Sequence, residues 1–380
     1  MIATPHTLHS GIGRIAIIAP PWYPVPPDGY GGIEQVVSVL VRELRARGYS
    51  VLAFGSAGSG DGILELAPSG LSEDLGALRG TVRELTYLAR VFETIERCGP
   101  VDVIHDHSGF AGLLGSTLLG LAPVVHTVHG HLGEWQRPFY EAMRGRAGLI
   151  AISEHQRSTA PGLSWIATVH NAVDLATLRV STRQEKQRFL LCLARICPEK
   201  GQHTAIEVAR RTGYRLVLAG KIEMTAEGQE YFRSQIQPHI DGDKVVYVEN
   251  VAGQRKADLL AQAAALIAPI EWEEPFGLSF VEAMVSGTAA ISFARGAARE
   301  LIQEGETGFV VRDVDEMVEA VVLARTLDPE RCAASARARF NPRVMVEGYC
   351  RAYLAAATGG LAAVPLDDPM DGSGVENAIA

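Results

Sequence analysis

The sequence predicts an α/β protein of two tandem, doubly wound, Rossmann-like domains, each with a parallel sheet covered by helices on both faces. Three observations predict this fold. Short β-branched runs alternate with longer helical patterns along most of the 380 residues, as in βαβ units. The predicted strands are almost continuously apolar, which is typical of strands buried on both faces. A polar, highly charged segment, 181–188, interrupts the alternation, and the same pattern restarts after it.

The first half contains five predicted strands and four predicted helices. The strands are short apolar runs at 14–20, 50–55, 101–105, 123–127 and 149–153. The helices have apolar residues at helical spacing and lie at 33–47, 82–97, 109–119 and 134–144. Strands and helices that alternate in this way favour parallel pairing of the strands.

The second half repeats the pattern with six strands and four helices. The strands are expected at 189–195, 214–219, 244–249, 266–269, 289–293 and 308–311. The helices are expected at 202–211, 253–264, 278–286 and 314–324. Segment 181–188 is then an interdomain linker and a candidate hinge. The tail, 359–380, is rich in Asp, Gly and Pro towards its end and is expected to be disordered.

Composition excludes several classes of function. The chain has 35 Lys and Arg against 44 Asp and Glu, a net charge of −9, which argues against a nucleic-acid-binding protein. Its five cysteines include no CxxC pair, so neither a disulfide framework nor a zinc site is expected. No apolar run is long enough to span a membrane, and no export signal is recognised. We therefore expect a soluble, cytoplasmic protein.

A loop with two glutamates follows the predicted strand 266–269. Glu274 comes just after the strand, and Glu282 lies in the next helix. Backbone N–H groups at a helix start lack intrahelical partners and can hold an anion, so the amides of 276–278 form a candidate anion site. The two carboxylates beside it are suited to sugar hydroxyls. The alternative is that they are a helix-start acid and an unrelated surface glutamate.

Two cations lie where another predicted strand ends. Arg195 ends the strand 189–195, and Lys200 precedes the next helix. An Arg fork and a Lys point charge together can neutralise a pyrophosphate and stabilise a phosphate leaving group. The alternative is ordinary solvated charge.

The long loop 20–34 contains Gly31 and Gly32 just before a helix, where backbone can approach a phosphate or sugar closely. It is not a dinucleotide-binding fingerprint, because no GxGxxG follows the strand, and no Gly-Lys-Ser/Thr of a Walker loop is present. An NAD-dependent oxidoreductase is therefore not favoured.

Five histidines gather in the first half: His105, His107, His126, His129 and His131. Alternate residues of a strand share a face, so a metal site is one interpretation. No Cys or paired carboxylate joins the spacing, and this interpretation is not favoured. His129, just past the end of its strand, is the better functional candidate. The alternative is a structural histidine.

Taken together, these motifs resemble those of the family 4 retaining glycosyltransferases, the GT-B group with a Glu-x7-Glu signature. The resemblance runs from about residue 14 to the helix at 344–357. The matching positions occur in the expected order: Gly31-Gly32-Ile-Glu34, His129, Ser153, Asn171-Ala-Val-Asp174, Arg195, Glu199-Lys200-Gly201, Ala219-Gly220, Glu274 to Glu282, Glu300 and Glu306-Thr-Gly308.

The resemblance implies a GT-B fold with an interdomain cleft. Its parts are an acceptor domain at 1–182, a nucleotide-sugar donor domain at 183–342, and a helix at 343–358 that crosses back to the first domain. The family pattern usually has Gly-Gly before Glu300, and this chain lacks it. Arg299 is therefore an alternative contact to the diphosphate.

The resemblance also implies roles for particular residues. His129, Arg195, Lys200 and Glu274 are the implied catalytic residues: the histidine and glutamate contact the donor sugar, and the cations hold its diphosphate. The residues implied to bind the donor are Gly31, Gly32, Arg195, Lys200, Gly220, Asn250, Val251, Glu274, Phe276, Gly277, Leu278 and Glu282.

The expected activity is transfer of a hexose, with retention of configuration, from a nucleotide diphosphate sugar to a hydroxyl group. UDP-glucose is the first candidate donor and GDP-mannose the second. No metal or other cofactor is expected, because the cations and helix amides take the place of one. A small-molecule or saccharide acceptor is favoured over a membrane lipid. The alternatives are a GT-B nucleotide-sugar epimerase and a catalytically silent nucleotide-sugar-binding protein.

Overall fold

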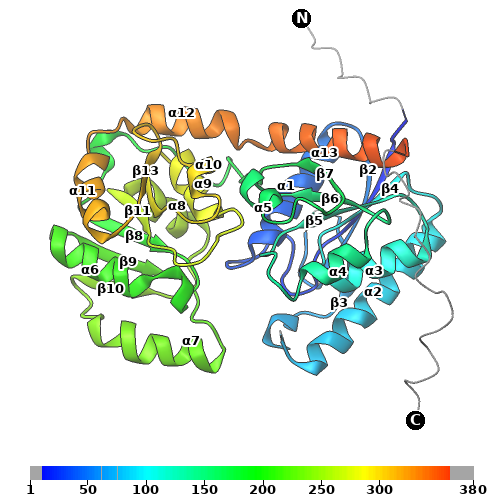
Figure 1. Ribbon diagram of the computed structural model, residues 1–380, viewed down its shortest axis with the longest axis horizontal. Helices are drawn as coiled ribbons and strands as arrows, with labels where there is room; N and C mark the ends of the chain where they lie inside the picture. Colours follow the sequence, from blue (N-terminus) through cyan, green and yellow to red (C-terminus); the bar gives the residue numbers. More distant parts are fainter. Residues whose placement is uncertain (1–10, 61, 75, 360–380) are drawn as a thin grey trace, which may run out of the picture.

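The computed structural model describes residues 11–60, 62–74 and 76–359. It shows two α/β halves that lie side by side, each built on its own parallel sheet (Figure 1). The predicted doubly wound fold is therefore confirmed. The tail predicted to be disordered, 359–380, lies outside the described residues apart from Gly359.

The N-terminal sheet has seven strands in the order β3-β2-β1-β4-β5-β6-β7, and all neighbours pair in parallel. Its strands are β1 (Arg14–Ile18), β2 (Ser50–Ser56), β3 (Leu64–Ala67), β4 (Val103–Asp106), β5 (Val124–Val128), β6 (Gly148–Ala151) and β7 (Trp165–Thr168). The sequence analysis missed β3 and β7. Both are edge strands that are only partly buried, so they lack the continuous apolar run of the inner strands.

Four helices of this half lie near their predicted positions, the last of them shorter than predicted: α1 (Gly32–Ala46), α2 (Leu78–Cys98), α3 (Phe110–Leu119) and α4 (Arg137–Ala142). The short helix α5 (Glu154–Thr159) was not predicted. None of the helices in the described ranges is long and apolar enough to cross a membrane.

The C-terminal sheet has six parallel strands in the order β10-β9-β8-β11-β12-β13. They are β8 (Phe189–Leu193), β9 (Arg215–Ala219), β10 (Val245–Val248), β11 (Ala265–Ala268), β12 (Ala290–Phe293) and β13 (Gly308–Val311). The predicted helices are α6 (Gln202–Thr212), α8 (Gly253–Gln262), α9 (Leu278–Val285) and α11 (Val314–Ala324). The helices that were not predicted are α7 (Ala226–Tyr231), α10 (Ala298–Leu301) and α12 (Pro329–Arg339).

The last helix, α13 (Pro342–Ala357), leaves the C-terminal half and lies along the N-terminal half (Figure 1). Its buried face includes Tyr349 and Tyr353, which pack in the same core cluster as Leu40 and Leu44 of α1. The N-terminal core is thus completed by residues that follow the whole C-terminal sheet in sequence.

The charged segment 181–188 is held against the C-terminal half. The Ser181 amide donates to the Ser286 carbonyl at 3.2 Å, and the Gln187 amide donates to the Gln262 carbonyl at 2.7 Å. A short 3₁₀ helix between them, Arg183–Glu185, has a capping box. The segment predicted as an interdomain linker is therefore hydrogen-bonded to one half; its role as a hinge stays a prediction.

Candidate active site

The carboxyl ends of the two sheets meet at a cleft of about 490 Å³, the edge at which doubly wound sheets bind ligands. Every residue predicted to act in catalysis or donor binding lines this one cleft. They are Gly31, Gly32, His129, Arg195, Lys200, Gly220, Asn250, Val251, Glu274, Phe276, Gly277, Leu278 and Glu282.

Glu274 is fixed by three neighbours. Its carboxylate forms an ion pair with the Lys200 ammonium and accepts a hydrogen bond from the Trp272 indole N–H at 3.0 Å. Gly296, with φ near +54°, lies so close to the Glu274 backbone that a Cβ at position 296 would overlap the Glu274 N and O atoms. This carboxylate and this ammonium are thus held at hydrogen-bonding range on one wall of the cleft.

The start of α9 leaves backbone donors open beside this pair. Gly277 precedes the helix with φ near +103° and supplies no side-chain cap. Within the described ranges, the amides of Phe276 and Gly277 donate to no acceptor. Glu282, one turn further on, is 6% exposed and pairs with Lys256 at 2.5 Å. A helix start with free amides favours an anionic group at this place.

Arg195 reaches the cleft from the end of β8. Its guanidinium pairs with Glu223 at 2.6 Å and with Glu199 at 3.2 Å. Both carboxylates, with Cys197, also form a group of metal-ligating type among the described residues. The cation already occupies those carboxylates, and burial raises the pKa of the Cys197 thiol to about 12, so the thiol is protonated and a poor ligand.

His129 is the cleft end of a chain of hydrogen-bonded histidines. Its Nε2 lies 2.8 Å from His107 Nδ1, and His107 Nε2 lies 3.3 Å from His105 Nδ1. His105 Nδ1 also lies 2.8 Å from the Tyr353 hydroxyl on α13, and its Nε2 lies 2.8 Å from the Thr127 hydroxyl. Burial lowers the pKa of His105 and His107 well below the usual value, and burial together with the charge of His126 lowers that of His129 to about 3. The three rings are therefore neutral at pH 7.

Direct contacts between the halves border the cleft. The Tyr30 amide donates to the Asn250 side chain at 3.3 Å, and Asn250 has a left-handed φ of 45°. The Ser153 hydroxyl donates to the Pro275 carbonyl at 2.7 Å. Asn250, which the resemblance implies binds the donor, therefore also contacts the N-terminal half.

Glu300 makes a second set of interdomain contacts. Its carboxylate accepts hydrogen bonds from the amides of Glu154 and His155, at 2.9 and 3.1 Å, and from His170 Nε2 at 2.5 Å. Burial raises the pKa of Glu300, but these hydrogen bonds outweigh it and leave the pKa below its usual value. Glu300 therefore binds the N-terminal half as a carboxylate.

One suggestion about the cleft is corrected. Arg299, considered as a contact to the diphosphate, is exposed and is not among the residues that line the cleft. The aromatic residues of segment 135–140 also lie outside the lining of the cleft: Trp135 is 73% exposed and Tyr140 is buried. In the proline-rich loop, Pro26 and Pro27 line a side pocket of about 250 Å³ that reaches Glu282.

Sequence reasoning missed three cleft residues that carry polar groups. Lys256, on α8, pairs with Glu282; the Trp272 indole bonds Glu274; and Tyr30 contacts Asn250. Lys256 and Trp272 could have been predicted from the sequence, because each follows the carboxyl end of a predicted strand. The Tyr30 contact joins positions 220 residues apart and had none.

Known proteins resemble this chain over most of its length. Residues 30–177 match the family Glycosyltransferase Family 4, and residues 176–339 match Glycosyl transferases group 1. A phosphatidyl-myo-inositol mannosyltransferase of Mycobacterium leprae is 26% identical and covers 91% of this chain and 98% of its own.

Two solved structures extend the comparison. AviGT4, a glycosyltransferase involved in avilamycin A biosynthesis, is 28% identical with a TM-score of 0.69, covering 91% of this chain and 98% of its own. The Anabaena protein HepE, solved in complex with UDP-glucose, is 18% identical with a TM-score of 0.68, covering 90% and 99%. The latter supports the fold alone.

Proposed function

Because this chain belongs to the family 4 glycosyltransferases and has their GT-B fold, we propose that it is a retaining hexosyltransferase that uses a nucleotide diphosphate sugar. The observation that carries the proposal is the convergence of two cations, two carboxylates and a helix start with free amides on one cleft. Cations and amides suit a diphosphate, and carboxylates suit sugar hydroxyls.

In the proposed reaction, the bond between the sugar C1 and the β-phosphate oxygen breaks as the acceptor oxygen bonds to C1 from the same face. Arg195, Lys200 and the amides of Phe276 and Gly277 stabilise the negative charge that grows on the departing phosphate. That phosphate takes the proton of the acceptor hydroxyl. Glu274 and His129 bind hydroxyls of the sugar and hold C1 beside the departing phosphate, with no covalent step on the protein and no metal.

Lys200 has to change partner during this reaction. Its ammonium is paired with Glu274, and a diphosphate carries more negative charge than the carboxylate. Donor binding would therefore attract the ammonium towards the phosphates and free Glu274 for the sugar. This exchange explains how one side-chain pair serves two parts of the donor.

UDP-glucose remains the first candidate donor, with a small-molecule or saccharide acceptor. Mannosyl transfer from GDP-mannose to a phosphoinositide is the second candidate. It is suggested by the mycobacterial relative, which is named a phosphatidyl-myo-inositol mannosyltransferase and matches along 98% of its length. The side pocket at Pro26 and Pro27 would hold the acceptor in either case.

The first experiment measures thermal unfolding with UDP-glucose, GDP-mannose and ADP-glucose, since a ligand that binds only the folded state raises Tm. The donor that raises Tm is then offered with soluble sugars or with phosphatidylinositol in mixed micelles, and NMR of the product reads its anomeric configuration. An inverted anomer would overturn the retaining assignment. Product formed from donor alone would identify an epimerase instead.

The matched variants are Lys200→Ala and Lys244→Ala. Lys200→Ala is expected to lower kcat by roughly a hundredfold or more with a Tm within a few degrees of wild type. Lys244 is an exposed lysine of the same half with no ion pair in the described part of the chain, and its replacement should leave kcat unchanged. Near-normal turnover of Lys200→Ala would contradict the proposal that the Lys200 charge stabilises the departing phosphate.

A further inference from the structure

A second pocket lies at the opposite edge of the C-terminal sheet from the cleft. It is about 290 Å³ in volume and lies where β8, β11 and β12 begin, beside Arg188, Ala264 and Ala289. The cleft lies where β8 and β11 end. The two pockets share no lining residue, so a ligand here would not occupy the donor site.

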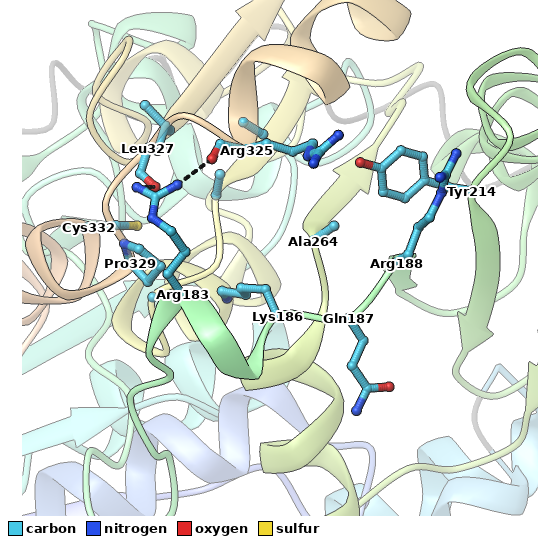
Figure 2. A pocket seen from close by; sticks show the side chains of 13 residues that line it. Arg183, Lys186, Gln187, Arg188, Tyr214, Ala264, Arg325, Leu327, Pro329 and Cys332 are labelled. Carbon is cyan, nitrogen blue, oxygen red and sulfur yellow. Dashed lines mark hydrogen bonds between the residues drawn. The ribbon is translucent and has the colours of Figure 1, made fainter.

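The walls of this pocket carry four basic side chains: Arg183, Lys186, Arg188 and Arg325. None of its lining residues in the described part of the chain is acidic, and none of the four cations forms an ion pair with a described carboxylate. Figure 2 shows Arg183 and Lys186 towards one side of the view, Arg188 beside Tyr214 towards the other, and Arg325 between them. In a chain of net charge −9, this concentration of positive charge would attract an anion.

Arg183 and Arg188 are held in place by neutral groups. The Arg183 guanidinium donates to the carbonyls of Arg325, at 2.6 Å, and Leu327, at 3.0 Å, at the end of α11. Arg188 lies over the Tyr214 ring at 5.2 Å from its centre. These contacts position the charges but leave them uncompensated.

Lys186 offers this pocket a hydrogen-bond donor. Its ammonium is half-buried and donates to the Ala261 carbonyl, at 2.9 Å, and to the Thr288 hydroxyl. An ammonium has three N–H donors, so one is left without an acceptor among the described residues. Burial lowers the pKa of Lys186 to about 7; Cys332 opposes this shift, Arg179 adds to it, and Glu185 opposes it by a smaller amount.

We propose that this pocket binds a small phosphorylated metabolite, a phosphate monoester of about the size of a sugar phosphate. The phosphate would accept hydrogen bonds from Lys186 and Arg325, whose side chains have no anionic partner, and the remainder would lie against Tyr214 and Leu327. A volume of 290 Å³ is about ten times a water molecule's share of the liquid, which is more than inorganic phosphate fills. Because Arg183, Lys186 and Arg188 belong to segment 181–188, the ligand would also hold that segment on the C-terminal half.

The test is isothermal titration of the full chain with glucose 6-phosphate, glucose and inorganic phosphate, each with and without saturating UDP. We expect glucose 6-phosphate to bind equally well in the presence of UDP, and glucose not to bind. Displacement by UDP would place the binding in the cleft and overturn the proposal. Inorganic phosphate binding as tightly as glucose 6-phosphate would overturn the assignment of a sugar phosphate.

The matched variants are Arg325→Ala and Arg351→Ala. The Arg325 side chain makes no hydrogen bond or ion pair with any described residue, so its loss should not disturb folding. Arg325→Ala is expected to weaken glucose 6-phosphate binding at least fivefold. Arg351→Ala removes the same charge from the exposed face of α13 and should leave binding unchanged. If the two variants weaken binding equally, the effect comes from the overall charge of the protein, and the proposal is overturned.

Proton uptake gives a further measurement. Lys186, with a pKa of about 7, is mostly neutral at pH 8, and a phosphate beside it would favour the charged form. Binding at pH 8 should therefore take up protons, which titrations in two buffers of different ionisation enthalpy detect. Binding with no proton uptake at pH 8 would contradict the contact with Lys186.

Discussion

Tyr353 determines which nitrogen of His129 carries the proton. The Tyr353 hydroxyl is buried, and His105 Nδ1 is its one hydrogen-bond partner among the described residues. A buried O–H needs an acceptor, so Tyr353 donates and His105 carries its proton on Nε2. His107 then donates from Nε2 to His105, and His129 donates from Nε2 to His107. His129 therefore presents an unprotonated Nδ1, an acceptor for a sugar hydroxyl.

Replacing Tyr353 with Phe should disturb this arrangement without touching the cleft. With no donor at His105 Nδ1, each ring of the chain can adopt either tautomer. We expect ¹⁵N NMR of His129 to change from a single Nε2–H tautomer to a mixture, and kcat to fall roughly tenfold, about 1.4 kcal/mol, with the donor KM little changed.

Tyr87→Phe is the matched control for this substitution. Tyr87 is also buried, and its hydroxyl donates to the Ala19 carbonyl at 2.9 Å, so each variant loses one buried hydrogen bond, about 1 kcal/mol. Only Tyr353→Phe should alter the His129 signal. A wild-type tautomer in Tyr353→Phe would show that the chain does not set it.

At the scale of elements, the site could be predicted because its residues follow the carboxyl ends of buried strands. The strands before Arg195 and Glu274 are apolar and buried on both faces, so their carboxyl ends could be found from the sequence, and topology then brings them together. Edge strands such as β3 and the short helix α10 have no such pattern. The interdomain contacts of Glu300 and Tyr30 join residues far apart in sequence, and no local pattern encodes them.

The loop between β12 and α10 supports the Glu274 loop through Gly296. The Glu273 carboxylate accepts from the Gly296 amide at 2.7 Å, and the Ala297 amide donates to the Glu274 carbonyl at 2.9 Å. Gly296→Ala would place a Cβ against the Glu274 backbone at a separation that real Cβ atoms do not show. We expect unfolding by urea to show a loss of about 2 to 4 kcal/mol and the donor KM to rise several-fold.

Gly305→Ala separates the two causes of that loss. Gly305 also has a left-handed φ, near +71°, but its Cβ would meet nothing within 4 Å. Gly305→Ala should lower the free energy of unfolding only through backbone strain, by about 1 kcal/mol, and leave the donor KM unchanged. If both variants lose the same stability and keep the same KM, close packing at Gly296 does not position Glu274.

At the scale of the whole molecule, α13 and the interdomain hydrogen bonds play different parts. α13 belongs to the N-terminal core and joins it to the C-terminal half, whereas Glu300 and the Ser153–Pro275 contact are hydrogen bonds between the halves, and we expect these to separate. Closure over a donor in GT-B folds needs contacts of this second kind, weak enough to open. The position of the halves should then depend on Glu300.

Glu300→Ala removes the acceptor of three hydrogen bonds between the halves. We expect small-angle scattering to show a larger radius of gyration for the free variant and a return to wild-type dimensions at saturating donor. The apparent donor affinity should fall about tenfold, since the closed state is less populated. Glu304→Ala is the matched control, because that carboxylate accepts from the Val310 amide within the C-terminal half; it should change neither quantity.

The pH dependence of the same contact provides an independent check. The folded pKa of Glu300 lies below the usual 4.5 of a glutamate, so its contribution to stability is present above pH 4.5 and is lost as the pH falls through the folded pKa. Wild type should therefore expand on acidification below pH 4.5, while Glu300→Ala, already open, should expand less. If acid expands both proteins equally, the opening comes from other carboxylates, and Glu300 does not control the distance between the halves.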